Sequence, residues 1–266
     1  MNQRWRNQRA FYRPNGEVIR TSEYEIFAIE HDRDARGFIE AHHYSRSYPA
    51  ARFRFGLYRH GSLAGVAVFS HPCNDAVLTN VFHCSAIDAV ELGRFVLLDN
   101  VPANGETWFL ARCFEQLKRE DLVGVVSFSD PVPRRTREGT IVHPGHIGTI
   151  YQAFNGCYLG LGARRTLLLL PDGSVLNART VQKIRRMERG WKYAAALLER
   201  FGADAISGDP VAWLDRWLPA LTRRLHHPGN HKYAWPLQRS ARKWMPISMQ
   251  YPKFSPLFAP PAQEHT

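Results

Sequence analysis

Short apolar runs alternate with helical segments along the first two thirds of the chain, and this order constrains the fold more than any other feature. Strands are predicted at 24–29, 52–58, 63–69, 90–98, 122–128 and 165–170, and helices at 33–42, 108–119 and 145–156. The pair His60-Gly61 between the second and third runs is typical of a hairpin turn. An antiparallel meander followed by β-α-β-α-β predicts an α/β fold with a mixed central sheet flanked by helices.

The last third of the chain differs in charge and in pattern. Residues 1–178 hold 20 basic and 18 acidic side chains, a net +2, whereas residues 179–266 hold 15 and 6, a net +9 of the total +11. Helices are predicted at 179–187, 191–201 and 210–225, followed by a proline-rich tail at 246–266. We therefore expect an N-terminal arm (1–22), an α/β domain (23–178) and a basic helical region (179–266). A basic face is typical of a protein that binds nucleic acid, and a basic protein without such a partner is the alternative.

Several classes of protein are disfavoured by composition. The four cysteines, Cys73, Cys84, Cys113 and Cys157, form no CxxC pair and no cluster with zinc-finger spacing. With 44% hydrophobic residues the chain has enough apolar side chains for a sizeable core. No run of about 18 apolar residues is present, and no apolar segment follows the basic N-terminus. We expect reduced thiols, no membrane span and a cytoplasmic location.

Four polar segments lie where chemistry is expected. They are His42 to Ser45 after the first helix, the loop Pro102 to Thr107, the strand end Ser127 to Pro131, and the segment Gly145 to Asn155. In open α/β sheets, ligands bind beyond the carboxyl ends of the strands. Asp130 follows such an end, and Tyr151 and Asn155 lie four apart, on one face of the predicted helix. These segments are therefore expected to meet at one cleft.

The predicted strand order is similar to that of the GNAT acyltransferases, and the polar segments resemble the phage Mom family of DNA-modification proteins. The elements that carry the resemblance are His43-Tyr44-Ser45, Glu91-Leu92-x-Arg94, Pro102-x-Asn104-x-Glu106-Thr107, Ser127-x-x-Asp130-Pro131, Gly145-His146-x-Gly148-x-Ile150-Tyr151-Gln152-Ala153-x-Asn155, His231-Lys232-Tyr233 and Tyr251-Pro252-Lys253. Their order and spacing cover about 35–253. The stretch 132–143 looks like an insertion, and Gly105 and Thr107 stand where alanine and serine are expected.

The resemblance implies a GNAT-like fold and an activity on DNA. The implied reaction converts the exocyclic amine of adenine to a carbamoylmethyl-type derivative and protects phage DNA from restriction in the bacterial cytoplasm. It implies double-stranded DNA as partner and an acyl-CoA, expected to be acetyl-CoA, as donor. An iron requirement has also been raised for the family.

The site residues are assigned from the resemblance together with position. Candidate catalytic residues are Asp130, His43, Tyr44 and Tyr151, with Asp130 or His43 as the base that takes the amine proton. Candidate cofactor-binding residues, in a loop that offers backbone N–H groups to a pyrophosphate, are Pro102, Asn104, Gly105, Glu106 and Thr107. Candidate substrate or DNA contacts are Ser45, Arg94, His146, Gln152, Asn155, Lys183, Arg185, Arg186, Lys232, Tyr233 and Lys253.

Structural alternatives exist for several of these residues. Asp130 before a proline can cap a turn, and Asn104 can cap a helix. Arg94 can pair with a carboxylate such as Glu91. Two further functions stay open: a GNAT N-acyltransferase acting on a small-molecule or protein amine, and a non-catalytic nucleic-acid-binding protein. The charge asymmetry disfavours the first of these, and the intact polar set disfavours the second.

Overall fold

The computed structural model describes residues 2–6, 9–14 and 16–253. The chain divides into two compact units, which are described one after the other. Unit 1 takes in 1–131, 144–162 and 230–266, and unit 2 takes in 132–143 and 163–229.

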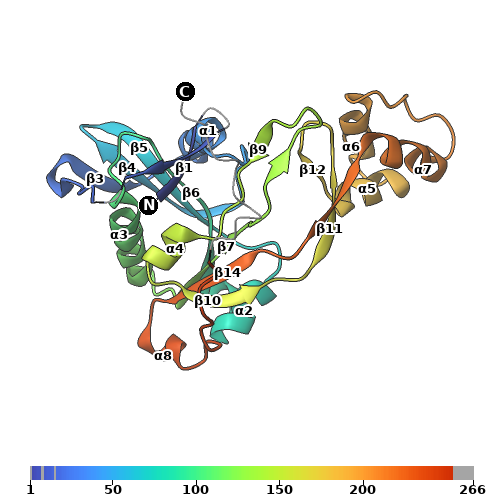
Figure 1. The fold of residues 1–266 in the computed structure, drawn as a ribbon. Helices are drawn as coiled ribbons and strands as arrows, with labels where there is room; N and C mark the ends of the chain where they lie inside the picture. The colour runs from blue at the N-terminus through green and yellow to red at the C-terminus, as the bar shows by residue number, and fades with distance from the viewer. Residues whose placement is uncertain (1, 7–8, 15, 254–266) are drawn as a thin grey trace. The chain divides into compact units, whose positions relative to one another are not determined.

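Unit 1 is built on a seven-stranded mixed sheet with the order β10-β14-β7-β6-β5-β4-β3 (Figure 1). Its strands are β3 (Tyr24–Ala28), β4 (Ala51–Arg59), β5 (Ser62–Ser70), β6 (Ala89–Leu97), β7 (Gly124–Ser129), β10 (Cys157–Leu161) and β14 (His231–Pro236). β6 and β7 pair in parallel, and the other neighbours pair antiparallel. The predicted mixed α/β sheet is confirmed.

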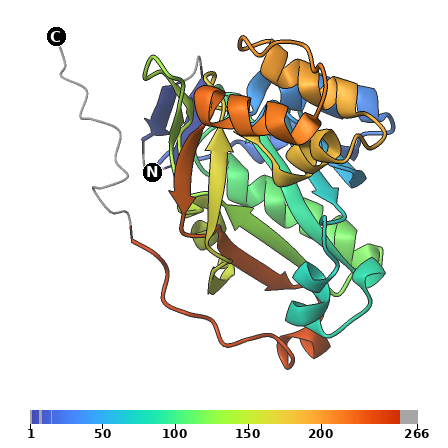
Figure 2. The ribbon, with the colours of Figure 1, turned by 90° about the vertical axis from the view of Figure 1, so that its right-hand side faces the viewer.

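Helices cover both faces of this sheet. They are α1 (Asp32–His42), α2 (Ala76–Phe82), α3 (Gly105–Arg119), α4 (Thr149–Ala153) and α8 (Arg239–Arg242). Successive strand residues point to opposite faces, so Val125 joins the core under α3 and α4, while Val126 joins the core under α2. The long helix α3, green in Figure 2, runs along the sheet. Fully buried Phe109 and Leu110 of α3 anchor it there.

Local sequence signals explain the turns and the N-terminal elements of unit 1. His60 (φ 48°) and Gly61 (φ 76°) both take left-handed conformations between β4 and β5, as the predicted hairpin turn requires. A second hairpin, β1 (Asn2–Arg6) with β2 (Arg9–Arg13), precedes β3. Short 3₁₀ turns lie at Thr21–Glu23 and Ala86–Asp88.

Unit 2 combines short strands with three helices of its own core. The strands are β8 (Arg134–Arg135), β9 (Ile141–His143), β11 (Arg165–Leu169), β12 (Val175–Leu176) and β13 (Arg223–His227), and the helices are α5 (Ala178–Arg185), α6 (Trp191–Glu199) and α7 (Pro210–Leu221). Ile184, Leu198 and Leu214 are fully buried in a common cluster. The Asp209 carboxylate caps α7, whose first residue is a proline, as helix starts favour.

The structure differs from the sequence-based expectation in how three segments pair. The strand predicted at 165–170 exists as β11, but it belongs to a three-stranded sheet with β12 and β13 in unit 2. β10 and β14, which the apolar pattern did not mark, join the central sheet instead. The helix predicted to reach 225 ends at Leu221, because the chain continues as β13 against β11.

The boundary of the basic region also lies elsewhere than at 179. Unit 2 resumes at 163 and ends at 229, and residues 230–253 return to unit 1. β10 and β14 pair antiparallel on either side of this excursion, and the Gly162 N–H donates to the Asn230 carbonyl at 2.8 Å. Unit 2 is therefore an insertion between two paired strands of unit 1, joined by the shorter stretch 132–143.

Candidate functional site

The site is centred on Asp130, the first residue after β7. The parallel pairing of β6 with β7 runs from Ala89↔Gly124 to Leu92↔Ser127, and β7 then continues only against β14. The Ser127 hydroxyl donates to the Leu92 carbonyl at 2.9 Å, at the last pair. Beyond this point β6 and β7 separate, so Asp130 stands at the carboxyl edge of the sheet, where the sequence predicts a ligand cleft.

His146 interacts with Asp130 in two ways, through a backbone hydrogen bond and through the charge of the Asp130 carboxylate. Its N–H donates to the Asp130 carbonyl at 2.8 Å, and its Nε2 is 3.1 Å from the Tyr44 hydroxyl. Burial lowers the pKa of His146 to about 4, although the Asp130 charge acts in the opposite direction. The imidazole is therefore neutral at pH 7, and the structure brings Tyr44, Asp130 and His146 together.

A second histidine–tyrosine pair lies near Asp130. His231 begins β14 and pairs with Ser129, the residue before Asp130. Its Nδ1 is 2.8 Å from the Tyr158 hydroxyl of β10. Burial also lowers the pKa of His231, and the Asp130 charge again opposes the shift. His231 and Tyr158 were absent from the predicted site residues, although His231 is part of a segment that carries the family resemblance.

His43 is nearly buried and has a defined orientation. The Ser45 N–H donates to its Nδ1 at 3.1 Å, and the Ser45 hydroxyl lies 2.8 Å from the same nitrogen. The ring also packs on Tyr44, with centroids 4.2 Å apart. Because Nδ1 accepts a backbone hydrogen bond, the neutral ring carries its proton on Nε2. His43 and Ser45 thus belong to the loop that positions Tyr44.

Tyr151 of α4 lies on the side of β7 that faces α3. Burial raises the pKa of its phenol, and a hydrogen bond with the Ser127 side chain opposes this shift. Burial likewise raises the pKa of Glu91, and the charge of Arg94 lowers it by less. Tyr151 is thus a protonated phenol at neutral pH. Its ring packs against those of Tyr233 and Trp235, at 5.5 and 5.7 Å.

Other predicted contacts have partners within the protein. The Arg94 guanidinium donates to the Ser47 carbonyl at 2.8 Å and to its hydroxyl at 2.7 Å, so it fixes the loop after α1. The Gln152 amide donates to the hydroxyl of Tyr233 at 3.0 Å, and that hydroxyl donates to the Ile147 carbonyl. These side chains therefore position the segment before α4.

Two site expectations need correction, the first because α4 is short. The helix ends at Ala153, so Asn155 does not share a helix face with Tyr151. Asn155 instead takes a left-handed conformation, φ 54°, and lines a pocket elsewhere in unit 1. Lys232 is also directed away from Asp130, since its ammonium donates to the Val77 carbonyl of α2. Lys253 is exposed at the end of the described chain.

The predicted cofactor loop is covered by side chains from the N-terminal part of the chain. The Ala103 N–H donates to the Glu17 carboxylate at 2.8 Å, and the Asn104 side chain accepts from the Ile19 N–H at 2.8 Å. The Pro102 carbonyl accepts from the Gly105 N–H, and the Thr107 hydroxyl donates to the Asn104 carbonyl. A pyrophosphate would need the N–H that Glu17 holds, so the loop in this arrangement does not fit one.

Glu106 has a structural role at the same helix start. Its carboxylate is 1% exposed and forms an ion pair with Arg4, N to O 2.6 Å. Arg4 also donates to the carbonyls of Leu98 and Val101. Together with Glu17, this carboxylate places negative charge at the N-terminus of α3, where a helix favours an anion.

Positive charge is concentrated in unit 2. It holds 15 basic and 7 acidic side chains, a net +8 of the total +11. Arg185 and Arg186 at the end of α5 are exposed, and Lys183 is half-buried. These three residues are 21 or more positions along the chain from any residue of unit 1, and they are counted in the charge of unit 2.

The described part of the chain has neither a metal-binding cluster nor a membrane-spanning helix. No group of three or more His, Cys, Asp and Glu side chains is arranged to hold a metal ion. No helix there is long and apolar enough to cross a membrane.

Comparison with known proteins identifies one family. The profile of the Mom protein family matches residues 23–253. No curated protein matches the chain. The structure is similar to a tandem GNAT protein from the clavulanic acid biosynthesis pathway, with 8% identity, a TM-score of 0.42, and 81% of this chain and 99% of that chain covered.

Two further solved structures give the same kind of similarity. An acetyltransferase from Bacillus subtilis in complex with CoA has 9% identity and a TM-score of 0.37, with 81% of this chain and 99% of that chain covered. A GNAT family N-acetyltransferase from Escherichia coli in complex with CoA has 15% identity and a TM-score of 0.33, with 50% and 68% covered. At TM-scores below 0.5 these similarities carry no information about substrate or reaction.

Proposed function

The chain belongs to the Mom protein family, and on that premise we propose that it is a DNA-modifying transferase acting on the exocyclic amine of adenine. The product is a carbamoylmethyl-type derivative that protects phage DNA from restriction. The observation that carries the proposal is the proximity of Asp130 to two histidines, each in contact with a tyrosine hydroxyl.

Asp130 is the general base in this proposal. The exocyclic amine of adenine is a poor nucleophile because its lone pair is delocalised into the ring, so a proton must leave as the new bond to nitrogen forms. His146 is neutral at pH 7 because its pKa is about 4, and it adds no positive charge beside the Asp130 carboxylate. A cation there would reduce the ability of the carboxylate to accept a proton.

The tautomer of His43 favours Asp130 over His43 as the base. The only unprotonated nitrogen of neutral His43, Nδ1, accepts from the Ser45 N–H. Its Nε2 therefore carries the proton of the neutral ring. Tyr44 and Tyr151 offer hydroxyl protons, the latter because burial keeps its phenol protonated. Either hydroxyl can protonate a leaving group.

One buried hydroxyl supports a polar ligand at this edge. The Ser129 Oγ is buried and has no hydrogen-bond partner among the residues that the structure describes. An unsatisfied buried hydroxyl costs stability unless a ligand or water completes it. It lies one residue before Asp130, next to Gly148 at the start of α4, so a polar substrate atom held there would lie on the α4 side of β7.

Unit 2 supplies the phosphate contacts in this proposal. Its net +8 favours a polyanion, and backbone phosphates account for most of the affinity in DNA complexes. The target amine lies inside the duplex, so the adenine must leave the stack to reach Asp130. Double-stranded DNA in the bacterial cytoplasm is therefore the proposed partner and setting.

The donor of the transferred group is proposed separately from the base. An acyl-CoA would pass its acyl group to the amine and release the CoA thiolate, which gives an amide. A carbamoylmethyl group is bonded through its CH₂ carbon, so the donor must carry its leaving group on that carbon. The pyrophosphate of CoA also has no fit while Glu17 holds the Ala103 N–H. For iron, no group of three or more His, Cys, Asp and Glu side chains is arranged to hold the ion within the described residues. The proton steps above involve only side chains of this chain and do not depend on the donor.

Mass spectrometry of nucleosides tests the proposed function. The protein is produced in bacteria, the cellular DNA is digested, and the adenine nucleosides are compared with those from cells that produce an Asp130→Asn variant. A modified deoxyadenosine only in cells with the parent protein is expected. Ordinary nucleosides in both, with folded protein in the cells, would contradict the proposal.

A further inference from the structure

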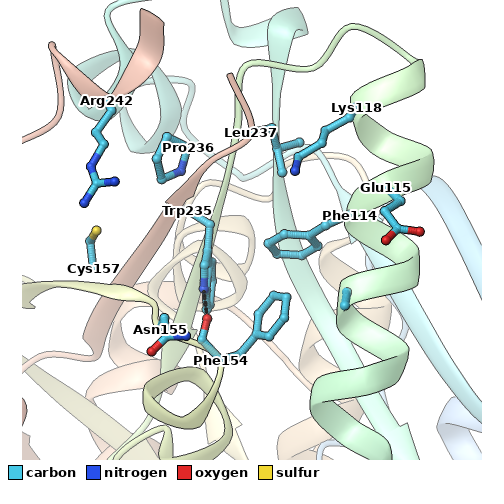
Figure 3. A pocket seen from close by; sticks show the side chains of 11 residues that line it. Phe114, Glu115, Lys118, Phe154, Asn155, Cys157, Trp235, Pro236, Leu237 and Arg242 are labelled. Carbon is cyan, nitrogen blue, oxygen red and sulfur yellow. Dashed lines mark hydrogen bonds between the residues drawn. The ribbon is translucent and has the colours of Figure 1, made fainter. Parts of the chain in front are cut away.

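Unit 1 contains a pocket far from Asp130. It has a volume of about 420 Å³ and lies between the second half of α3, the end of α4, β10, the end of β14 and α8 (Figure 3). Pro236 in its wall pairs with Gly124, the first residue of β7, whereas Asp130 follows the last residue. Six residues of strand separate these two positions by about 20 Å. The pocket is therefore distinct from the candidate active site, and its size falls within the range of ligand sites.

Aromatic rings form the floor and one wall of the pocket. Phe114 meets Phe154 and Trp235 edge to face, with centroids 5.0 and 5.6 Å apart. The Trp235 Nε1–H donates to the Phe154 carbonyl at 2.8 Å, which fixes the indole. A Cβ at Gly156 would come within 2.7 Å of the same indole, so only glycine permits this packing. Phe114 and Trp235 are each only 6% exposed, so the half-buried Phe154 ring supplies most of the accessible aromatic surface of the pocket.

Two cations flank this surface. Figure 3 shows Lys118 and Arg242 on opposite sides of the Trp235 indole. Both side chains are exposed, and within the described residues neither has a carboxylate partner. The one acidic residue of the lining, Glu115, is paired with Arg112 at 2.7 Å, which offsets its charge. The rim therefore carries net positive charge that no carboxylate among the described residues neutralises.

Asn155 adds a polar edge to the same pocket. Its side chain is exposed, and its carboxamide has no hydrogen-bond partner among the described residues. An amide offers one acceptor and two donors in a plane, and this pattern matches the edge of a nucleobase. The left-handed φ of 54° fixes the direction in which the residue leaves the end of α4.

We infer that this pocket binds a nucleotide. The base packs against the accessible Phe154 ring, its edge pairs with the Asn155 amide, and the phosphate lies between Lys118 and Arg242. Base–aromatic stacking and cation–phosphate contacts are the usual elements of such sites. The nucleotide is either free or part of a single strand, since both present the same chemistry. The inference does not depend on the reaction proposed at Asp130.

Calorimetric titration of the full chain with AMP, CMP and a single-stranded hexanucleotide tests the inference. We expect binding that falls on the order of tenfold in the double variant Lys118→Gln/Arg242→Gln. Asn155→Gly should also weaken binding, and glycine accepts the positive φ without strain. The control Arg239→Gln removes an exposed charge from the same helix α8 outside the lining and should change nothing.

The results of this titration distinguish the two sources of the nucleotide and test the location of the site. If only the mononucleotides bind, the ligand is a free nucleotide. If the hexanucleotide binds and the pocket substitutions weaken its binding as much as that of the mononucleotides, the ligand is a single strand. Asp130→Asn should leave the affinity unchanged, which separates this pocket from the candidate active site. No binding of any probe, or binding that the three pocket substitutions leave unaltered, would overturn the inference.

Discussion

The backbone N–H of His146 donates to the carbonyl oxygen of Asp130, so the segment that leads into α4 is fastened to the end of β7. The same histidine contacts Tyr44, which follows α1 on the opposite face of the sheet. One hydrogen-bonded path therefore joins loops that are about a hundred residues apart in the chain. Substitutions along it should affect chemistry more than folding, as the first prediction states.

Replacing Asp130 by asparagine should abolish DNA modification. The substitution keeps the shape and removes the proton acceptor, and a general base contributes about 10²–10⁴-fold to rate. Activity is measured as modified deoxyadenosine per total deoxyadenosine. Asp121→Asn is the matched control, since Asp121 lies in a turn before β7 at φ 57°, a conformation that asparagine accepts. A rate within tenfold of the parent would assign the base to another residue.

Stability should decrease with acid in a way that depends on His146. Its folded pKa of about 4 lies below the ordinary 6.5, so between these values the unfolded chain binds a proton that the folded chain does not. The free energy of unfolding therefore falls as the pH drops, by about 2 kcal/mol from pH 7 to pH 5 for this group. Urea unfolding at both pH values measures it. His146→Gln should lose this part of the pH dependence, and equal slopes in the two proteins would contradict the prediction.

Replacing Glu17 by alanine should increase the affinity for an anion at the start of α3. The Ala103 N–H loses its carboxylate partner, and the helix N-terminus then has a donor for a phosphate oxygen. Titration with CoA measures the change. The loss of one hydrogen bond should lower the free energy of unfolding by about 1 kcal/mol. Glu25→Ala, an exposed site in β3, is the control. If neither the parent nor the Glu17 variant binds CoA, the donor is another compound.

Replacing Lys183, Arg185 and Arg186 together by alanine should weaken binding to all DNA sequences alike. Phosphate contacts position a protein without reading sequence, and each contributes about −0.9 to the log–log slope of affinity against salt. The slope is measured for the parent and the triple variant, and fold stability should change little because two of the side chains are exposed. A control triple in unit 1, Arg20, Arg33 and Arg119, should retain the parent slope. An unchanged slope in the first triple would place the DNA elsewhere.

The sequence predicts local elements of unit 1 well because their signals are local. The alternation of apolar residues marks β4 and β5, and His60-Gly61 marks their turn. The pairing of strands into a sheet is harder to predict, because it depends on residues that are distant in the sequence. The strand at 165–170 has a clear apolar run, but nothing in that run indicates that β13, rather than the central sheet, is its partner.

The same limit applies to the candidate site. Asp130, Tyr44 and His146 were expected at one cleft because strand ends and glycine turns are visible in the sequence. Tyr158 reaches the site through the antiparallel pairing of β10 with β14. No residue spacing along the chain predicts its contact with His231. Glu17 likewise reaches the loop before α3 from 86 positions away. Long-range pairing, and not residue type, was the missing information.

The hydrogen bond between Gly162 and Asn230 makes β10 and β14 a hairpin whose loop is an entire folded unit. The entropy cost of closing a flexible loop grows only with the logarithm of the loop length. If the loop folds first, its ends are already close together and the entropy cost of closure is smaller still. Assembly of the central sheet should therefore wait for the insertion to fold, since β14 is made last and must return beside β7. A circularly permuted chain that begins at β14 would remove that delay, and its refolding rate would show whether the insertion governs the order of assembly.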